Sequence, residues 1–368
     1  MNSNPIAAKP HYAVLDGLRG VAALLVVAFH LCEAHAHSRF EQIINHGYLA
    51  VDFFFLLSGF VIGYAYDDRW GKLSMGNFFK RRLIRLQPMV IIGMVVGAVC
   101  FYFQSGSLWP MINTVPAWKV ILIMLVGFTM LPVPPSMDIR GWIEMYPLNG
   151  PGWSLFFEYI ANILYAVVFR RFSKVALAVF VFLAACLLVH LAVFGKQGDV
   201  IGGWALEPEQ LHIGFSRVLF PFFAGLLLCR SVKIIQVKNA FFICSMLVAL
   251  VLSLPRFGGE SKLWLNGLYD SFSIIIMFPL IVWLGAGGGA QGKLASKVCK
   301  FFGDISYPIY ITHYPIIYIY TAWVYENKMP LASALPYTIL SFVACVAVAY
   351  TSFKLYDEPV RKWLATKF

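Results

Sequence analysis

The chain has 368 residues, of which 60% are hydrophobic and only 13% are Asp, Glu, Lys or Arg. Soluble domains average about 45–50% apolar and about 25% charged residues, so this composition excludes a soluble globular enzyme, a disordered chain and a collagen-like chain. The formal net charge of +11 would suggest phosphate-bearing partners on a soluble protein. Here an excess of Lys and Arg on one side of a membrane explains the charge, and nucleic acid is not expected as a partner.

Apolar windows of about membrane length follow one another along almost the whole chain. The expected spans lie near residues 13–32, 47–66, 88–105, 117–134, 152–169, 175–194, 215–230, 239–254, 268–285, 304–324 and 332–353. If every window crossed the membrane, the basic joint at 170–174 and the later basic joints would lie on the extracytoplasmic side. The proline-flanked window near 117–134 is therefore expected to be re-entrant or interfacial. The predicted fold class is an all-α integral membrane protein, a bundle of about ten transmembrane helices plus this one segment.

The distribution of cationic residues supports this topology. With ten crossings and both termini on the same side, twenty of the 29 Lys and Arg residues lie in joints on that side and seven on the other. Cytoplasmic loops carry such an excess, so both termini are expected in the cytoplasm. We expect residues 1–368 to form a single transmembrane domain without a separate soluble domain. The seven cysteines form no C-x-x-C pair, and no metal site is expected.

Three polar side chains lie within the first expected span, HYAVLDGLRGVAALLVVAFHL. A charged side chain at bilayer depth costs at least about 2.5–3.5 kcal/mol and normally faces a polar cavity. Arg19 and His30 project from one helix face about 16 Å apart, and Asp16 lies one turn before Arg19. Taken singly, these residues are also explained by an interfacial ion pair and a packing histidine. Their alignment favours a lined cavity.

The second span and the joint after it carry the next polar positions. Asp52 lies near the start of the span HGYLAVDFFFLLSGFVIGYAY. Ser58 and Gly59 interrupt the aromatic residues of this span, and such small residues favour close helix packing. The joint FFKRRLIRLQP places four cations at helical spacing, namely Lys80, Arg81, Arg82 and Arg85. Membrane topology alone would explain this cluster, and a multiply phosphorylated ligand would explain it equally.

A carboxylate lies within the span PLNGPGWSLFFEYIANILYAVVF. If this helix enters from the outer surface, Glu158 lies about two turns deep, at a depth similar to that of His30. A carboxylate beside an imidazole would form an acid–base pair. A structural hydrogen bond to a neighbouring Tyr or Asn explains Glu158 equally well.

The last part of the chain adds a second histidine in a span. In FGDISYPIYITHYPIIYIY, two prolines are expected to kink the helix around His313. A catalytic role for His313 is left open, and we expect it rather to contact substrate or to pack. The closing segment YDEPVRKWLATKF is explained by an ordinary surface pair between Glu358 and Arg361. No role is assigned to the isolated residues His190, Arg217 and Asp270.

The ordered set of motifs resembles one family. LDGLRG followed by His30, then VDFFFLLSGF, FFKRRLIRLQP, WSLFFEY, ISYPIYITHYP and YDEPVRKW, is similar to the acyltransferase family 3 of membrane O-acyltransferases. The resemblance implies a ten-span enzyme of the bacterial cytoplasmic (inner) membrane. Such an enzyme takes an acetyl or other short acyl group from cytoplasmic acyl-coenzyme A and delivers it to a hydroxyl of a cell-surface or exported glycan. Some members carry an additional extracytoplasmic esterase-like domain, which is not expected here.

The resemblance also assigns roles to residues. The expected catalytic residues are His30, as general base, Glu158 and Arg19. The expected acyl-coenzyme A-binding residues are Arg19, Lys80, Arg81, Arg82 and Arg85. Residues expected to contact substrate or line the cavity are Asp16, Asp52, Ser58, Trp153, Tyr307 and His313. Acetyl-coenzyme A is the expected acyl donor, without a metal. The other expected partners are a glycan or lipid-linked saccharide acceptor and membrane lipids, and a homo-oligomer is left open.

A transporter is the main alternative to this enzyme. Arg19, His30 and Glu158 would equally form the relay of a proton-coupled transporter or exporter of a glycan or small solute. The sequence shows no H-E-x-x-H motif, no Gly-rich phosphate loop and no G-x-S-x-G elbow. Zinc proteases, nucleotide hydrolases and α/β-hydrolases are therefore not expected.

Overall fold

The computed structural model of the protein describes residue 9, residues 11–289 and residues 292–367. These residues contain no β-strand and one isolated β-bridge, between Glu144 and Ala205. The α-helices are α1 (Ala13–Glu33), α2 (Ala50–Tyr66), α3 (Met75–Cys100), α4 (Ala117–Phe128), α5 (Gly152–Val167), α6 (Lys174–Phe194), α7 (Pro208–Ser231), α8 (Ala240–Ser253), α9 (Trp264–Phe272), α10 (Phe278–Ala286), α11 (Lys293–Thr312), α12 (Tyr314–Asn327), α13 (Leu331–Ser352) and α14 (Glu358–Lys367). The prediction of an all-helical protein is confirmed.

Seven helical segments within the described ranges are long and apolar enough to cross a membrane. They are Ala13–Glu33, Gly47–Tyr66, Met75–Gln104, Lys174–Phe194, Pro208–Ser231, Trp264–Ala286 and Leu331–Lys367. α4 and α8 are apolar but have only 12 and 14 residues. Helices of this length reach about 18–21 Å, which is less than the roughly 30 Å of a hydrocarbon core. The structure is that of a multi-pass membrane protein.

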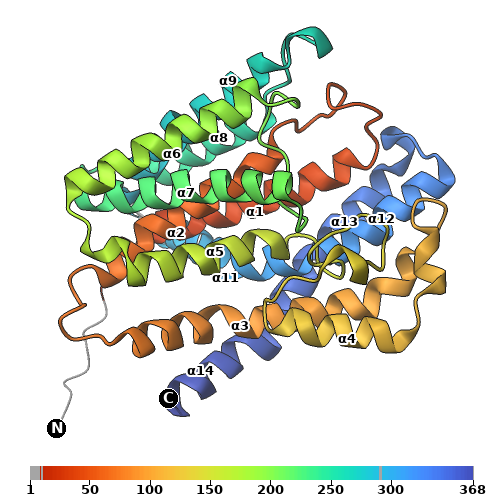
Figure 1. Ribbon diagram of the computed structural model, residues 1–368, viewed down its shortest axis with the longest axis horizontal. Helices are drawn as coiled ribbons and strands as arrows, with labels where there is room; N and C mark the ends of the chain where they lie inside the picture. The colour runs from red at the N-terminus through yellow and green to blue at the C-terminus, as the bar shows by residue number, and fades with distance from the viewer. Residues whose placement is uncertain (1–8, 10, 290–291, 368) are drawn as a thin grey trace.

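Helices pass repeatedly between two ends of the bundle (Figure 1). α1 lies in the centre and packs against α2, α8, α11 and α13, whereas α7 packs against α2 and α6. The joints from α2 to α3 and from α5 to α6 lie at one end, on the left in Figure 1. Arg230, at the end of α7, joins them there through Asp67 and the carbonyl of Phe169. We call this the basic end, and the other the far end.

Two expected spans are interrupted. α9 and α10 are joined by a π-helical turn, Ser273–Met277, and α11 is separated from α12 by His313. Pro315 has no amide hydrogen to donate to the carbonyl of Ile311, which explains the break. That carbonyl accepts a hydrogen bond from Asn149 Nδ2 at 2.7 Å instead. Asn149, from the segment before α5, thus stabilises the break between α11 and α12, where the sequence predicted a kink.

Small residues allow α2 and α7 to pack closely, as the sequence predicted beside Ser58. A Cβ atom at Gly59 would collide with the carbonyl of Phe222, and one at Gly225 would collide with the carbonyl of Leu56. The two backbones therefore touch, in the manner of helix pairs within membranes.

The segment before α5 is folded into the bundle. Residues 144–151 are all buried, and the Tyr146 hydroxyl donates a hydrogen bond to the carbonyl of Met130 at 2.6 Å. α5 then begins at Gly152 and has 16 residues. Because its start is buried, counting turns from an exposed first residue does not give the depth of Glu158.

Candidate active site

His30 lies in the last turns of α1, near the far end of the bundle. Its Nδ1 atom donates a hydrogen bond of 2.8 Å to Glu33 Oε2, one turn later on the same helix. A carboxylate can only accept, so Nδ1 carries the hydrogen and the neutral ring keeps a lone pair on Nε2. The ring contacts Tyr314 edge-on, with centroids 4.8 Å apart. His30 therefore has the geometry of a general base acting through Nε2.

His313 lies beside His30 at the break between α11 and α12. The two rings are stacked, with centroids 5.7 Å apart and an interplanar angle of 29°. His313 Nδ1 lies 3.0 Å from the carbonyl oxygens of Ile309 and Tyr310, so it carries the hydrogen of the neutral ring. Its Nε2 is buried and has no hydrogen-bond partner among the described residues. A second imidazole acceptor therefore lies next to His30.

Glu158 contacts a different set of side chains from the one expected. Its Oε1 atom accepts a hydrogen bond from Ser58 Oγ at 2.6 Å and one from Arg82 Nη2 at 3.1 Å. Arg82 is in the second turn of α3 from the basic end, about 10 Å along the helix, whereas His30 is about 26 Å along α1. The carboxylate that holds the His30 ring is thus Glu33 and not Glu158. The buried segment before α5 explains the difference in depth.

Three arginines gather at the basic end from three helices. Arg19 Nη1 on α1 lies 3.6 Å from Asp16 Oδ1, and Arg361 Nη2 on α14 lies 2.9 Å from Asp357 Oδ2. Arg85, which is exposed on α3, interacts electrostatically with all four of these residues. Three guanidinium groups therefore face two carboxylates, which leaves a net positive charge. Such a group suits phosphate, which arginine binds through paired hydrogen bonds.

Two further cations on α3 and one tyrosine lie at the same end. Arg81 is exposed, and Lys80 is partly buried. The Tyr307 hydroxyl on α11 donates to the carbonyl of Leu86 at 2.9 Å. This bond ties α11 to α3 next to Arg85, so Tyr307 positions the helix that carries the cations.

Asp52 and Trp153 both contact Arg217, a residue with no predicted role. Asp52 is fully buried and accepts hydrogen bonds from Arg217 Nη2 at 2.6 Å and Nε at 3.3 Å. The guanidinium lies over the Trp153 ring, 5.1 Å from its centroid, and also donates to the carbonyl of Tyr48 at 2.8 Å. A buried charge pair with these partners holds α2, α5 and α7 together.

A second ionic network lies at the far end. Arg256 and Arg39 lie 3.1 Å and 2.8 Å from Asp199, while Asp270 accepts hydrogen bonds from the Tyr48 hydroxyl at 3.0 Å. Burial raises the pKa of the Asp199 carboxyl, and the two arginines oppose that shift. The network joins the loop after α1 to the loops after α6 and α8.

An aromatic cage encloses Arg140 near the start of the buried segment. The guanidinium stacks on Tyr318 at 3.6 Å, lies 5.1 Å from the Trp109 centroid and donates to Gln104 Oε1 at 2.8 Å. Glu144 lies 3.5 Å from Arg140 and accepts from the Tyr318 hydroxyl at 2.7 Å. Burial is the main cause that raises the pKa of the Glu144 carboxyl to about 7.

No cluster of His, Cys, Asp or Glu that would hold a metal ion occurs within the described ranges. The chemistry available from these residues is that of acid–base catalysis and phosphate binding. The two imidazoles of His30 and His313 lie near the far end, and a group of arginines lies at the basic end. Ser58 on α2, Arg82 on α3 and Glu158 on α5 form a polar cluster that joins these three helices.

Comparison with known proteins identifies the family. The family model described as an acyltransferase domain, the third acyltransferase family, matches residues 12–352. The chain belongs to this acyltransferase family. The resemblance drawn from the sequence motifs is confirmed over nearly the whole chain.

Relatives of this family member include named O-acetyltransferases. The chain is 24% identical over 363 residues to O-acetyltransferase OatA of Staphylococcus aureus, covering 95% of this chain and 57% of that protein. It is 25% identical over 379 residues to peptidoglycan O-acetyltransferase OatA of Listeria monocytogenes, covering 95% of this chain and 55% of that protein. It is 33% identical over 162 residues to "Protein 2 in picA locus" of Rhizobium radiobacter, covering 42% of this chain and 81% of that protein. The chain thus spans little more than half the length of the two OatA proteins. No solved structure matches the chain significantly.

Two residues with clear partners in this site were missed from the sequence. Glu33 is three residues after His30, so the helical spacing that paired Asp16 with Arg19 would also have paired it with His30. Arg361 was assigned to Glu358, but in the structure it forms an ion pair with Asp357 and interacts electrostatically with Arg85. Only the packing of α14 on α3 reveals that position.

Proposed function

We propose that this protein is a membrane-bound O-acyltransferase that moves an acetyl or other short acyl group from cytoplasmic acyl-coenzyme A to a hydroxyl of a cell-surface or exported glycan. Membership of the family and the names of its relatives support acyl transfer to a glycan. The observation that carries the proposal is the hydrogen bond from His30 Nδ1 to Glu33, which leaves Nε2 as the base.

The proposed topology has ten crossings in a bacterial inner membrane. α5, the broken α11–α12 pair, and α8 together with the non-helical residues on either side of it would add three crossings to the seven long segments, with α4 re-entrant. The excess of Lys and Arg at the basic end supports a cytoplasmic location of that end and of both termini. Residues 1–8 and Phe368, at the termini themselves, lie outside the described residues.

The acyl donor would bind at the basic end. Arg19, Arg81, Arg85 and Lys80 would hold the phosphates of acyl-coenzyme A, and Arg361 would join them because it interacts electrostatically with Arg85. The pantetheine arm would then extend along the bundle towards His30, so that the thioester lies close to the imidazole. Asp16 would hold Arg19 in place.

Residues between the two ends would line the route of the donor. Arg82 is held by Glu158, and Glu158 by Ser58, so these three side chains would form one wall of the passage. Asp52 and Trp153 would support that region through Arg217.

The proposed reaction is a direct transfer. His30 Nε2 removes the proton of the acceptor hydroxyl, and the oxygen attacks the thioester carbonyl carbon. The carbon–sulfur bond then breaks, and the coenzyme A thiolate takes the proton from the imidazolium. Glu33 stabilises the charged ring during this step, and His313 Nε2 offers an acceptor for a second hydroxyl of the glycan. The acceptor would be a glycan or a lipid-linked saccharide that approaches from the far end.

The test compares wild-type protein with His30→Ala and with a control variant, His190→Ala, whose side chain is exposed on α6. O-acetyl groups on surface glycans are measured by mass spectrometry, and acetyl-coenzyme A binding by calorimetry on purified protein. His30→Ala should lower transfer by about 10²–10⁴-fold, the usual contribution of a general base, and still bind the donor. Solute flux driven by a pH gradient, with no binding of acetyl-coenzyme A, would instead identify a proton-coupled transporter.

A further inference from the structure

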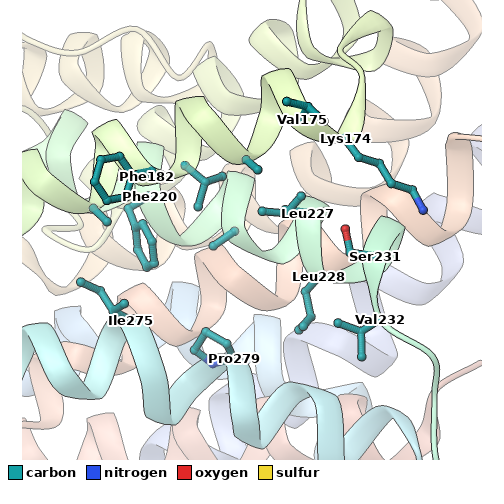
Figure 2. A pocket seen from close by; sticks show the side chains of 14 residues that line it. Lys174, Val175, Phe182, Phe220, Leu227, Leu228, Ser231, Val232, Ile275 and Pro279 are labelled. Carbon is teal, nitrogen blue, oxygen red and sulfur yellow. The ribbon is translucent and has the colours of Figure 1, made fainter.

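A groove of about 640 Å³ lies on the side of the bundle, between α6, α7 and the α9–α10 segment. Figure 2 shows its lining side chains. Apart from Lys174 and Ser231, every lining residue is apolar. None of the residues assigned to acyl transfer lines it. The groove is therefore separate from the candidate active site.

Small side chains and a helix irregularity create this groove. Ala178 and Ala185 on α6 and Ala224 on α7 leave space between the two helices. Ile275 on the third wall belongs to the π-helical turn, and Pro279 lies in the first turn of α10, the helix after it. Such π-turns occur frequently at functional sites. The shape thus arises from the sequence of three separate segments.

The groove has the depth of one leaflet. It extends along α6 from Lys174 at the basic end to Ala185, a length of about 16 Å at 1.5 Å per residue. A hydrocarbon core is roughly 30 Å thick, so this length takes a chain from the surface to about the midplane. In Figure 2, Lys174 and Ser231 lie at one end of the groove, and Phe182, Phe220 and Ile275 lie at the other.

The end of the groove at the membrane surface is positively charged. Lys174 is the first residue of α6, and Ser173 caps that helix by accepting from the amide of Ala176. The positive end of the α6 dipole therefore lies beside the Lys174 ammonium. Lys174 makes no ion pair with any described residue, and Ser231 adds a hydroxyl from the end of α7. Cation, hydroxyl and helix end together suit a phosphodiester.

We propose that this groove binds one anionic phospholipid, with an acyl chain along the apolar lining and its phosphate at Lys174 and Ser231. The apolar walls exclude a sugar or a nucleotide, because they offer no polar partners below the surface. An uncompensated lysine favours a headgroup with net negative charge over a zwitterionic one. The binding site is independent of the proposed acyl transfer.

The experiment titrates purified protein in detergent with phosphatidylglycerol and with phosphatidylcholine of the same acyl chains, and counts bound lipids by native mass spectrometry. Two variants alter the site: Lys174→Glu reverses the charge, and Ala178→Trp fills the groove. Two matched controls change exposed residues elsewhere, Lys297→Glu on α11 and Ala176→Trp on the outer side of α6. The side chain of Ala178 is exposed, so a tryptophan introduced at this position fills the groove without entering the core of the bundle. Thermal unfolding of every variant checks that the fold is intact.

Wild-type protein and both controls should retain one phosphatidylglycerol with a Kd about tenfold lower than that for phosphatidylcholine. Lys174→Glu should abolish this preference, and Ala178→Trp should weaken binding of both lipids. Equal affinity of the wild type for the two lipids would overturn the proposal. Unchanged binding in folded Lys174→Glu and Ala178→Trp would also overturn it.

Discussion

Glu33 accepts a hydrogen bond of 2.8 Å from His30 Nδ1 within one turn of α1. The imidazole and the carboxylate that accepts from it therefore belong to the same helix, and their geometry does not depend on how the other helices pack. Glu158, the partner expected from depth along the chain, binds Ser58 and Arg82 instead. The polar residues thus divide into a histidine with its own carboxylate near the far end and a charged cluster closer to the basic end.

Replacing Glu33 by Gln should separate orientation of the ring from stabilisation of its charge. An amide oxygen can still accept from Nδ1, but it lacks the negative charge that favours the imidazolium formed during transfer. We expect kcat to fall about tenfold, equivalent to roughly 1.4 kcal/mol, with an unchanged KM for acetyl-coenzyme A. Steady-state kinetics measure both constants. Glu260→Gln, at an exposed position in the loop before α9, serves as the control. Full activity of the Glu33 variant would show that the carboxylate charge does not stabilise the imidazolium.

A double-mutant cycle should detect the coupling between Arg82 and Glu158. Both side chains are only about 15% exposed, so the loss of either partner leaves a charge in a poorly hydrated place. We expect Arg82→Ala and Glu158→Gln each to lower the melting temperature, and the double variant to lose about 0.5–3 kcal/mol less than the sum. The exposed Lys300–Asp304 pair provides the comparison and should show a smaller coupling. Additive effects at Arg82 and Glu158 would mean that their contact contributes nothing.

Prediction from the sequence succeeded where the relevant information was local. Hydropathy identified the helices, and the helical period placed Asp16 against Arg19. The order of short motifs identified the family, which the match over residues 12–352 confirmed. The same local rule would have paired Glu33 with His30, so that omission was avoidable.

The remaining contacts depend on packing between distant segments. Arg217 and Asp52 are 165 residues apart in the chain, and nothing in either span points to the other. The depth of Glu158 depends on the burial of residues 144–151, which hydropathy assigned to a joint between spans. Such relationships require the three-dimensional arrangement of the helices.

Arg217 should matter more for folding than for catalysis. Removing its side chain would leave the Asp52 carboxylate buried without a counter-charge, which typically costs about 3–5 kcal/mol. We expect Arg217→Ala to be recovered from membranes in much lower amounts than the wild type and to unfold at a lower temperature. Arg39→Ala should have little effect, because Arg39 is half exposed and Asp199 keeps Arg256. Equal recovery of both variants would contradict the structural role of Arg217.

Arg361 should contribute to donor binding from the end of the chain. It interacts electrostatically with Arg85 and would add a fourth guanidinium, after Arg19, Arg81 and Arg85, for the phosphates of acetyl-coenzyme A. We expect Arg361→Ala to raise the KM for acetyl-coenzyme A several-fold and to leave kcat unchanged, because the residue is far from the reacting atoms. Lys367→Ala, at the exposed end of α14, is the control. Higher ionic strength should narrow the difference between wild type and Arg361→Ala, and a drop in kcat alone would contradict a binding role.

Glu144 should make the stability of the protein depend on pH. Its pKa is raised by burial from an ordinary 4.5 to about 7, so the folded protein holds this proton more tightly than the unfolded chain does. The stabilisation is complete below pH 4.5, declines as the pH rises towards 7 and is absent above it. Glu144→Gln keeps an acceptor for the Tyr318 hydroxyl and cannot titrate.

Thermal unfolding in detergent between pH 4.5 and 8 measures the effect of Glu144. The melting temperature of the wild type should fall with rising pH more steeply than that of Glu144→Gln, and the two slopes should become equal above pH 7. Glu209→Gln, at an exposed position on α7, controls for the loss of a carboxylate and should follow the wild type. Equal slopes of melting temperature against pH for wild type and Glu144→Gln over the whole range would contradict the prediction. Glu144 would then be ionised in the folded state and form an ordinary ion pair with Arg140.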